Sequence, residues 1–284
     1  MFEENVLLAP FTKMKVGGYA RYFVKARSRE EMQKAFAFCR EKEMAYFVLG
    51  KGSNVIFDDR GFRGLVILNK MDDFFLDVEG MCVVGSGYSF SRLGMRTAKE
   101  GWSGLEFAVG IPGSVGGAVF MNAGADGGET FDRLSSVEYL GECGEILTLK
   151  KEDLFFSYRN TSFQEMRGVV LNASFVLERC DAARERQMSI LQRRKDTQPY
   201  GEASAGCVFR NAESVSAGKL IDGCGLKNTK IGSACVSEVH ANFIVNLGGA
   251  TSKDLLSLIS HVKKRVYEKT GVVLEQEVCF VPYE

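Results

Sequence analysis

A glycine-rich stretch between Gly101 and Gly128 constrains this 284-residue chain more than any other feature. Its centre, Gly110–Ala118, holds four glycines and one proline in nine residues. Glycine lets successive backbone N–H groups point the same way, and such nests bind phosphate oxygens. A bulged strand with its turn is the structural alternative, but it does not need so many small residues in succession. The stretch therefore predicts a loop that approaches a flat or charged ligand closely.

A second glycine-containing loop, Gly50–Asn54, directly follows the apolar segment Tyr46–Leu49, which is typical of a short strand. It is not a GxGxxG dinucleotide fingerprint, because Val55 stands where the third glycine belongs. It is not a P-loop either, because the chain contains no GxxxxGK[ST]. By itself the segment predicts either an ordinary tight turn or a second phosphate-binding loop.

Charge and composition exclude several classes of protein. Basic and acidic residues balance at 36 each, which gives no sign of nucleic-acid binding or of an anionic membrane surface. No apolar run is long enough to span a bilayer, and Met1–Pro10 lacks the layout of a signal peptide, so we expect a cytoplasmic protein without membrane insertion. The eight cysteines form no CxxC pair and there are only two histidines, so we expect reduced thiols and no metal site.

Residue patterns predict a mixture of strands and helices. Ser28 and Glu31 indicate a capping box at the start of a helix with an apolar face, and Gln198-Pro199 ends another helix. A third helix is expected to be capped by Ser252 and to end at Gly271. The helix that ends at Gln198-Pro199 is predicted over Asp181–Thr197, and a further helix is predicted over Ser89–Glu100. The predicted strands are Arg21–Ala26, Tyr46–Leu49, Val55–Phe57, Gly64–Leu68, Met81–Gly85, Ser136–Leu140, Ile146–Leu149, Val169–Leu177, Cys207–Phe209 and Asn242–Asn246.

The motifs of the chain resemble those of the UDP-N-acetylenolpyruvoylglucosamine reductase family. Gly101–Ala118 and Met121–Gly124 are similar to the family signature GxSGLEF…GIPGSVGGA…MNAG. Arg159 and Cys207 are 48 positions apart, a spacing that resembles the shorter, second type of the family. Further motifs match in the same order along nearly the whole chain: Thr12–Gly18, Ser157–Arg159, Arg193-Arg194, Gln198-Pro199, Ala205–Phe209, Gly218–Ile221, Val236-Ser237, His240–Phe243 and Leu274–Val278.

The resemblance implies an α+β fold with an FAD-binding domain of the vanillyl-alcohol-oxidase/p-cresol-methylhydroxylase type. Its two subdomains are expected over residues 1–72 and 73–197, and a smaller α+β substrate-binding domain over residues 198–284. The implied activity is the NADPH-dependent reduction of UDP-N-acetylglucosamine enolpyruvate to UDP-N-acetylmuramate in bacterial peptidoglycan precursor synthesis. In that reaction non-covalently bound FAD delivers hydride from its N5 to C3, and an acid adds a proton at C2. A monomer is favoured over an oligomer.

The same resemblance places FAD on both glycine-containing loops and on the segment that follows Gly110–Ala118. Lys51 departs from the family's GGGSN and puts a side chain beside the expected pyrophosphate. Ala203, Ala212 and Cys279 also depart from the family's motifs, the last by replacing an arginine near the flavin. The expected FAD contacts are Gly50, Lys51, Gly52, Ser53, Asn54, Gly110, Ile111, Pro112, Gly113, Ser114, Gly116, Gly117, Asn122 and Gly124.

Three residues are expected to carry the chemistry. Arg159 can grip the enolpyruvyl carboxylate at two points, although a structural salt bridge is the alternative. Cys207 matches the family's general acid, and a thiol with a free pKa of about 8.5 is mostly protonated at neutral pH. Glu277 can assist if burial raises its pKa, the alternative being a solvent-facing strand residue, with Glu275 two positions away as a decoy. Expected substrate contacts are Tyr158, Asn211 and His240, and Lys219 matches a motif without an assigned role.

Two other functions stay open at this stage. One is another FAD oxidoreductase of the same fold, such as an alcohol or lactone oxidase. The set of Arg159, Cys207 and Glu277 argues against it, because oxidases usually need a base and a route for oxygen. The other is a non-catalytic nucleotide-binding protein, which predicts either no yellow flavin or a flavin that NADPH never bleaches.

Overall fold

The computed structural model describes residues 2–212 and 215–283 and divides the chain into two compact units. The first unit contains Phe23–Lys51 and Leu65–Arg193. The second contains Phe2–Tyr22, Gly52–Gly64 and the described residues from Arg194 onward. Each unit has its own hydrophobic core and combines helices with strands, so the predicted α+β class is confirmed.

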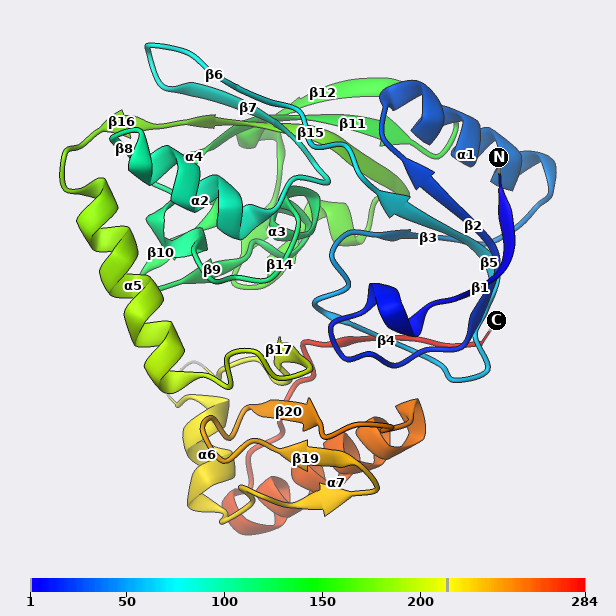
Figure 1. Ribbon diagram of the computed structural model, residues 1–284, viewed down its shortest axis with the longest axis vertical. Coiled ribbons are helices and arrows are strands. Elements are labelled where there is room, and N and C mark those ends of the chain that lie inside the picture. The colour runs from blue at the N-terminus through cyan, green and yellow to red at the C-terminus, as the bar shows by residue number, and fades with distance from the viewer. Residues whose placement is uncertain (1, 213–214, 284) are drawn as a thin grey trace. The chain divides into compact units, whose positions relative to one another are not determined.

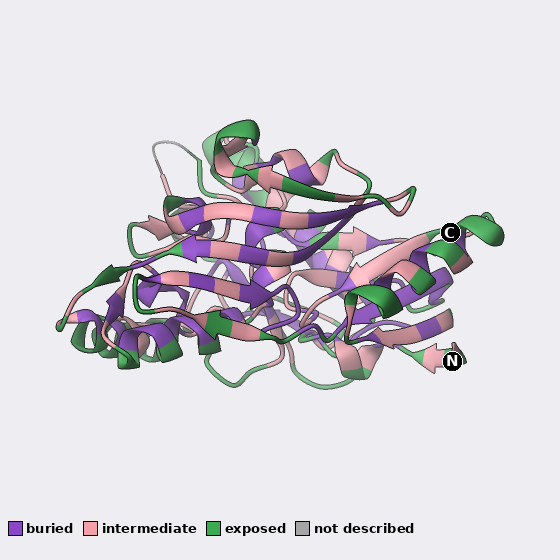
Figure 2. Cartoon of the chain, turned by 90° about the horizontal axis from the view of Figure 1, so that it is seen from above, coloured by how far each residue is buried: buried purple, intermediate pink, exposed green. Residues whose placement is uncertain are grey.

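The largest sheet lies in the first unit and has five antiparallel strands in the order β12-β11-β15-β7-β6. Helices α2, α3 and α4 lie along one side of this sheet (Figure 1). Figure 2 shows buried and less buried positions alternating along its strands, as expected for strands with one face on a core. The bounds are β6 Phe74–Leu76, β7 Met81–Gly85, β11 Leu134–Gly141, β12 Ile146–Lys150, β15 Gly168–Val176, α2 Phe90–Lys99, α3 Val115–Met121 and α4 Thr130–Arg133.

A four-stranded sheet has the order β1-β2-β5-β3, with β3 and β5 parallel. Helix α1 follows β2, and Ser28 caps it by accepting the N–H of Glu31 at 3.3 Å. The Glu31 carboxylate accepts the N–H of Arg27 instead of that of Ser28, so only half of the predicted capping box forms. The bounds are β1 Glu3–Leu7, β2 Tyr19–Ala26, β3 Tyr46–Leu49, β5 Phe62–Asn69 and α1 Arg29–Glu41.

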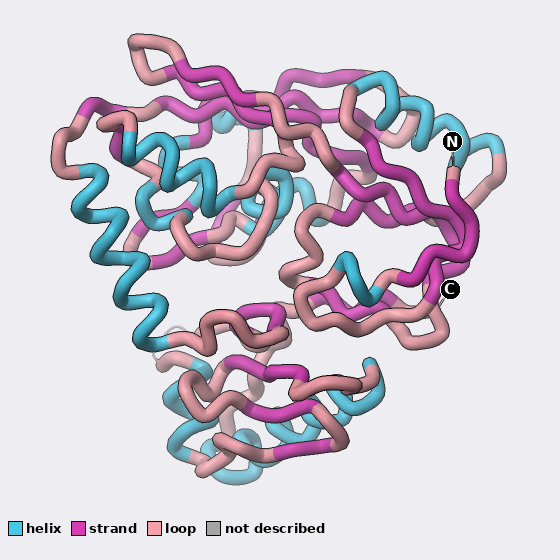
Figure 3. Tube along the Cα trace, in the orientation of Figure 1, coloured by secondary structure: helices cyan, strands magenta, loops and turns pink. Residues whose placement is uncertain are grey.

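The second unit contains an antiparallel sheet in the order β17-β20-β19-β18. Helices α6 and α7, cyan in Figure 3, pack together, and α7 lies against β18 and β19. Leu255, Ile259, Val262 and Val266 form an apolar face of α7, and all four are buried. The bounds are β4 Val55–Phe57, β17 Ser204–Cys207, β18 Lys230–Ile231, β19 Ala234–Val236, β20 Phe243–Asn246, β21 Cys279–Val281, α6 Ala217–Gly223 and α7 Ser252–Thr270.

Short elements complete the fold of the described residues. Helix α5 begins at Ala183, two positions later than predicted, and ends at Thr197 directly before Gln198-Pro199. The other short strands form two-stranded pairs, β8 with β16, β9 with β10 and β13 with β14. Their bounds are β8 Trp102–Ser103, β9 Gly124–Ala125, β10 Gly128–Glu129, β13 Phe156–Ser157, β14 Asn160–Thr161 and β16 Glu178–Arg179. Single helical turns lie at Ala9–Phe11, Glu106–Ala108, Lys151–Asp153 and Ser162–Gln164.

Helix α3 is an element that the sequence did not predict. Gly116 and Gly117 lie in its first turn, and glycine in a helix interior is less favourable than alanine by about 1 kcal/mol. The helix forms nevertheless, because Val115, Ala118 and Val119 are buried in the core of the first unit. Tertiary packing therefore overrides local propensity at this position.

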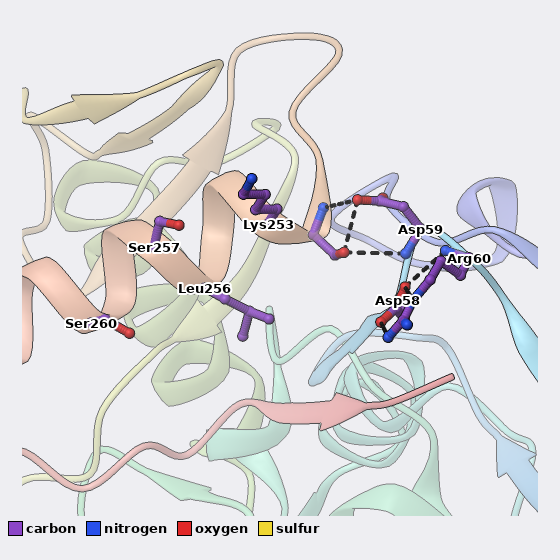
Figure 4. Close-up of a pocket in the computed structure, with 8 residues that line it drawn as sticks. Asp58, Asp59, Arg60, Lys253, Leu256, Ser257 and Ser260 are labelled. Carbon is purple, nitrogen blue, oxygen red and sulfur yellow. Dashed lines mark hydrogen bonds and ion pairs between the residues drawn. The ribbon is translucent and has the colours of Figure 1, made fainter. Parts of the chain in front are cut away.

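Thr251, and not Ser252 as predicted, caps helix α7. Thr251 Oγ1 accepts the N–H of Asp254 at 3.0 Å, and the Asp254 carboxylate accepts the N–H of Thr251 at 3.0 Å. Ser252 instead donates its N–H and its hydroxyl to the Asp59 carboxylate (Figure 4). Because Thr251 and Ser252 both carry a hydroxyl group, the sequence alone does not show which of them is the N-cap.

We expect Thr251→Ala to lower the free energy of unfolding by about 1 kcal/mol, because an N–H in the first turn of α7 loses its acceptor. Urea denaturation followed by circular dichroism measures the change. Thr251→Ser keeps the hydroxyl and serves as the control. Equal stability of the alanine and serine variants would contradict this assignment of the cap.

Candidate active site

The two loops predicted to hold a cofactor meet in the first unit, at Gly50 and Ser114. A Cβ atom on Gly50 would lie 2.3 Å from Ser114 Oγ, so the close approach of the two segments requires glycine. Ser114 is also the N-cap of α3, since its Oγ accepts the N–H of Gly117 at 3.3 Å. The two glycine-containing loops, 64 positions apart in the sequence, are therefore in direct contact.

Most N–H groups of the Gly110–Gly117 loop are already bonded inside the chain. The N–H of Gly110 donates to Ser91 Oγ at 2.8 Å. Those of Ile111, Val115 and Gly116 donate over 2.8–3.0 Å to the carbonyl oxygens of Ala108, Tyr88 and Ser86, respectively. Within the part of the chain that the structure describes, the N–H groups of Gly113 and Ser114 have no acceptor.

Ser114 is only 4% exposed, and a buried N–H without a partner is rare in a folded protein. Together with the N–H of the half-buried Gly113, this donor is suited to a phosphate oxygen. The loop therefore fits the diphosphate of a dinucleotide, although the donors left for it are the two residues before α3 and not the first turn of the helix.

The rest of the other loop lies in the second unit. Gly52 has a φ of +61°, and a Cβ atom there would lie 2.2 Å from the carbonyl oxygen of Phe11. Asn54 connects the loop to the C-terminal segment, because its Nδ2 donates to the Glu277 carbonyl oxygen at 3.2 Å and its own carbonyl accepts the N–H of Cys279 at 3.0 Å. Gly52 and Asn54 thus fix the loop from both sides.

The departures from the family motifs cause no backbone strain in the second loop. Lys51 is not among the residues with positive φ, so its side chain is accommodated in an ordinary backbone conformation. It is half-buried. Cys279 is the first residue of β21, which pairs in parallel with β4, so this departure lies in a strand.

Arg159 occupies the two-residue turn between β13 and β14. Its φ of +57° lies in the left-handed region, which costs a non-glycine residue about 1–2 kcal/mol. Its Nη1 donates to the carbonyl oxygen of Asn122 at 3.1 Å and its Nη2 to that of Gly124 at 2.8 Å. Both acceptors are main-chain carbonyl oxygens, and the two bonds orient the guanidinium.

Cys207 and Glu277 lie on neighbouring backbone segments of the second unit. Cys207 ends β17 and is paired with Phe243 of β20. The carbonyl oxygen of the next residue, Val208, accepts the N–H of Glu277 at 2.8 Å. Both Cys207 and Glu277 are half-buried, whereas Glu275 is exposed. Of the two glutamates, Glu277 is therefore the less accessible to solvent.

The three predicted substrate contacts lie in three different surroundings. Tyr158 precedes Arg159 in the turn and is 47% exposed, with its ring 5.0 Å from the Arg159 guanidinium carbon. Asn211 is exposed, and its Oδ1 accepts the N–H of Ala217 at the start of α6 at 3.0 Å. His240 is half-buried, and its Nδ1 accepts the N–H of Asn242 at 3.2 Å, which leaves the proton of a neutral ring on Nε2. Lys219 lies exposed on α6.

Burial lowers the pKa of His240 below its usual value of about 6.5. The unfolded chain therefore binds this proton more readily than the folded chain, so His240 makes the free energy of unfolding fall as the pH drops below about 6.5. We expect His240→Asn to reduce this acid sensitivity. Urea titrations between pH 7.5 and pH 5 compare it with wild type and with His261→Asn, which removes the other imidazole. Identical slopes for His240→Asn and wild type would contradict the assignment.

Two residues that support the site were missed from the sequence. Asn242 is 2% exposed, and its carboxamide accepts the N–H of Phe209 at 3.0 Å and donates to the carbonyl oxygen of Phe209 at 2.8 Å, two positions after Cys207. Gln164 donates its Nε2 to the Arg159 carbonyl oxygen at 3.0 Å. The role of Gln164 depends on how the turn folds, so no sequence pattern predicts it.

A pocket beside the start of α7 contains none of the predicted site residues (Figure 4). The pocket is lined by Asp58, Asp59, Arg60, Ser252, Lys253, Leu256, Ser257 and Ser260.

In the described ranges 2–212 and 215–283, no group of histidine, cysteine, aspartate and glutamate side chains is arranged to hold a metal ion. No helix in those ranges is long and apolar enough to cross a membrane.

Comparison with known proteins covers the whole chain. Residues 198–281 match the family described as UDP-N-acetylenolpyruvoylglucosamine reductase, C-terminal domain, and residues 20–150 match the FAD binding domain. The UDP-N-acetylenolpyruvoylglucosamine reductase of Protochlamydia amoebophila is 53% identical over 100% of this chain and 95% of its own length. That of Chlamydia muridarum is 44% identical over 99% and 95%.

A solved structure also matches nearly the whole length of the chain. The crystal structure of UDP-N-acetylenolpyruvylglucosamine reductase from Thermus caldophilus superimposes with a TM-score of 0.84 at 38% sequence identity. The match covers 99% of this chain and 100% of that one. With an FAD-binding domain followed by the reductase's C-terminal domain, the chain belongs to the UDP-N-acetylenolpyruvoylglucosamine reductase family.

Proposed function

We propose that this chain is an FAD-dependent oxidoreductase that reduces UDP-N-acetylglucosamine enolpyruvate to UDP-N-acetylmuramate with NADPH. The observation that carries the proposal is the 53% identity, over the whole chain, to a reductase named for this substrate. The setting is peptidoglycan precursor synthesis in the bacterial cytoplasm, with the protein acting as a monomer. Residues 1–72 and 73–197 form the two FAD-binding subdomains, and residues 198–284 the substrate-binding domain.

The residues present fit non-covalently bound FAD. The N–H groups of Gly113 and Ser114 bind a phosphate oxygen, and Gly50 lets the second loop approach them. Lys51 adds a positive charge beside the diphosphate. When bound, FAD supplies a two-electron carrier between NADPH and the enolpyruvyl carbon. The other proposed contacts are Gly52, Ser53, Asn54, Gly110, Ile111, Pro112, Gly116, Gly117 and Gly124.

Three side chains of this protein handle the charge and the proton. Arg159 binds the enolpyruvyl carboxylate with its oriented guanidinium and stabilises the negative charge that develops there. Cys207 donates the proton of its Sγ to C2 and regains one from solvent, to which its half-buried position gives access. Glu277, in its protonated form, donates a hydrogen bond to the same carboxylate. Tyr158, Asn211 and His240 contact the sugar nucleotide.

An anaerobic two-step experiment tests the function. NADPH is added to the purified yellow protein first, and the enolpyruvyl sugar nucleotide afterwards. We expect the flavin colour to bleach and then return, with UDP-N-acetylmuramate as the product in mass spectrometry. UDP-N-acetylglucosamine, which lacks the enolpyruvyl group, is the matched control and should leave the flavin reduced.

The two alternative functions give different results in the same experiment. A non-catalytic nucleotide-binding protein shows no bleaching with NADPH. An oxidase of the same fold shows no return of colour with the enolpyruvyl compound until oxygen or another acceptor is admitted. Either outcome overturns the proposed reductase.

A further inference from the structure

Asn122 is a buried asparagine whose side chain forms hydrogen bonds within the chain through both its oxygen and its nitrogen. It is 0% exposed, ends α3 and has a φ of +41°. Its Oδ1 accepts the N–H of Phe131 at 3.1 Å, and its Nδ2 donates to the carbonyl oxygen of Ser157 at 3.2 Å. A carboxamide with no exposed surface and with partners at both ends has no face to offer to a ligand. Its effect on the reaction must therefore pass through another residue.

That residue is Arg159, two positions after Ser157. The turn that carries Arg159 is bonded to the end of α3 at several points besides Asn122 Nδ2. The guanidinium donates to the Asn122 carbonyl oxygen. Gln164 Nε2 donates both to the Arg159 carbonyl oxygen at 3.0 Å and to the Phe120 carbonyl oxygen at 3.1 Å. Thr161 Oγ1 donates to the same Phe120 oxygen at 2.8 Å.

The turn needs this support for physical reasons. β13 and β14 have two residues each, and an isolated hairpin of this size is at best marginally stable in water. Arg159 in addition holds a left-handed conformation that a non-glycine residue adopts only when the surrounding structure imposes it. Without the bonds to the end of α3, both the turn and the direction of the guanidinium are lost.

We propose that Asn122 and Gln164 are positioning residues, which hold the turn so that the Arg159 guanidinium meets the substrate carboxylate. The proposal rests on the proposed function, because it needs a substrate with a carboxylate. It gives Asn122 a different task from the cofactor contact that its motif predicts.

Two isosteric variants separate this task from others. Asn122→Asp keeps the acceptor for Phe131, tolerates the left-handed conformation and replaces the donor to Ser157 with an oxygen. Gln164→Glu does the same to the donor to the Arg159 carbonyl. Displacement of a binding group by about 1 Å can slow a reaction about 10²-fold, so we expect the enolpyruvyl substrate to reoxidise the reduced flavin about 10²-fold more slowly in Asn122→Asp. Reduction by NADPH should keep its wild-type rate, because NADPH carries no carboxylate.

A matched control is available in the same unit. Asn172 in β15 donates its Nδ2 to Glu138 Oε2 at 2.6 Å, a bond that involves neither the turn nor the end of α3. Asn172→Asp also replaces an amide donor with a carboxylate oxygen, and it should reoxidise at the wild-type rate. Hydrogen exchange of the backbone over residues 156–161 adds a readout that needs no turnover, and it should be faster in Asn122→Asp and Gln164→Glu only.

The outcomes separate the hypotheses. Equal reoxidation rates for Asn122→Asp, Gln164→Glu and Asn172→Asp overturn the positioning role. Loss of FAD from Asn122→Asp, or an equal fall in both half-reactions, overturns it in favour of a cofactor contact. If Asn122→Asp does not fold, the half-exposed Gln164 decides through its own variant. If wild-type reduced flavin is not reoxidised by the enolpyruvyl compound, the proposed function fails first and the positioning role fails with it.

Discussion

Replacing Cys207 with alanine is expected to slow turnover about 10³-fold, within the range of about 10²–10⁴-fold that a positioned general acid contributes. The alanine side chain has no proton to give to C2. Steady-state NADPH oxidation in the presence of the enolpyruvyl substrate measures the loss. Flavin reduction by NADPH alone should be unaffected, because that step does not use the thiol.

Two further cysteine variants make this result interpretable. Cys207→Ser keeps a proton on a side chain of similar size, so we expect it to retain part of the activity. Cys224→Ala removes another half-buried thiol of the same unit, at the end of α6, and should turn over normally. Near-normal turnover of Cys207→Ala would remove Cys207 from the mechanism and leave the source of the proton to be found elsewhere.

The second large effect is expected from Gly52→Ala. The new Cβ would lie 2.2 Å from the Phe11 carbonyl oxygen and 2.8 Å from Thr12 Cα, and backbone atoms cannot move aside as a flexible side chain can. The left-handed φ of +61° adds its own cost. Together we expect a loss of about 2–4 kcal/mol in the free energy of unfolding, and weaker FAD binding because the loop shifts.

Gly225→Ala is the matched control for Gly52→Ala. Gly225 has a similar φ of +72° but nothing within 4 Å of the added Cβ, so the variant loses only about 1–2 kcal/mol. The difference between the two variants isolates the close approach of the Gly52 backbone. Urea denaturation measures stability, and the flavin absorbance that is retained after gel filtration measures cofactor binding. Equal losses in both would contradict the steric argument.

Much of the fold could be predicted from periodicity and capping residues. The buried faces of α1 and α7 follow the spacing of their apolar residues, and Gly271 ends α7 as expected. Helix α3 could not be predicted, because the glycines that allow its first turn to pack closely are the residues that argue locally against a helix.

The site is less visible in the sequence than the fold, because its geometry arises between distant residues. Cys207 and Glu277 are 70 positions apart, and their segments meet through backbone contacts such as the bond from the Glu277 N–H to the Val208 carbonyl oxygen and the bridge between Phe209 and Gln276. The motif pointed to Arg159, but the left-handed conformation of its turn and the role of Gln164 depend on contacts with the end of α3. The motif predicts that Arg159 binds the substrate, but it does not show which contacts orient its side chain.

The two N–H groups before α3 have a thermodynamic consequence. The neighbouring donors of the Gly110–Gly117 loop are consumed by bonds within the chain, so the loop has its shape before any phosphate arrives. Little conformational entropy is then lost on binding. A ligand that satisfies Gly113 and Ser114 binds the folded chain alone and stabilises it by mass action, which makes FAD a part of the folding equilibrium as well as a reagent.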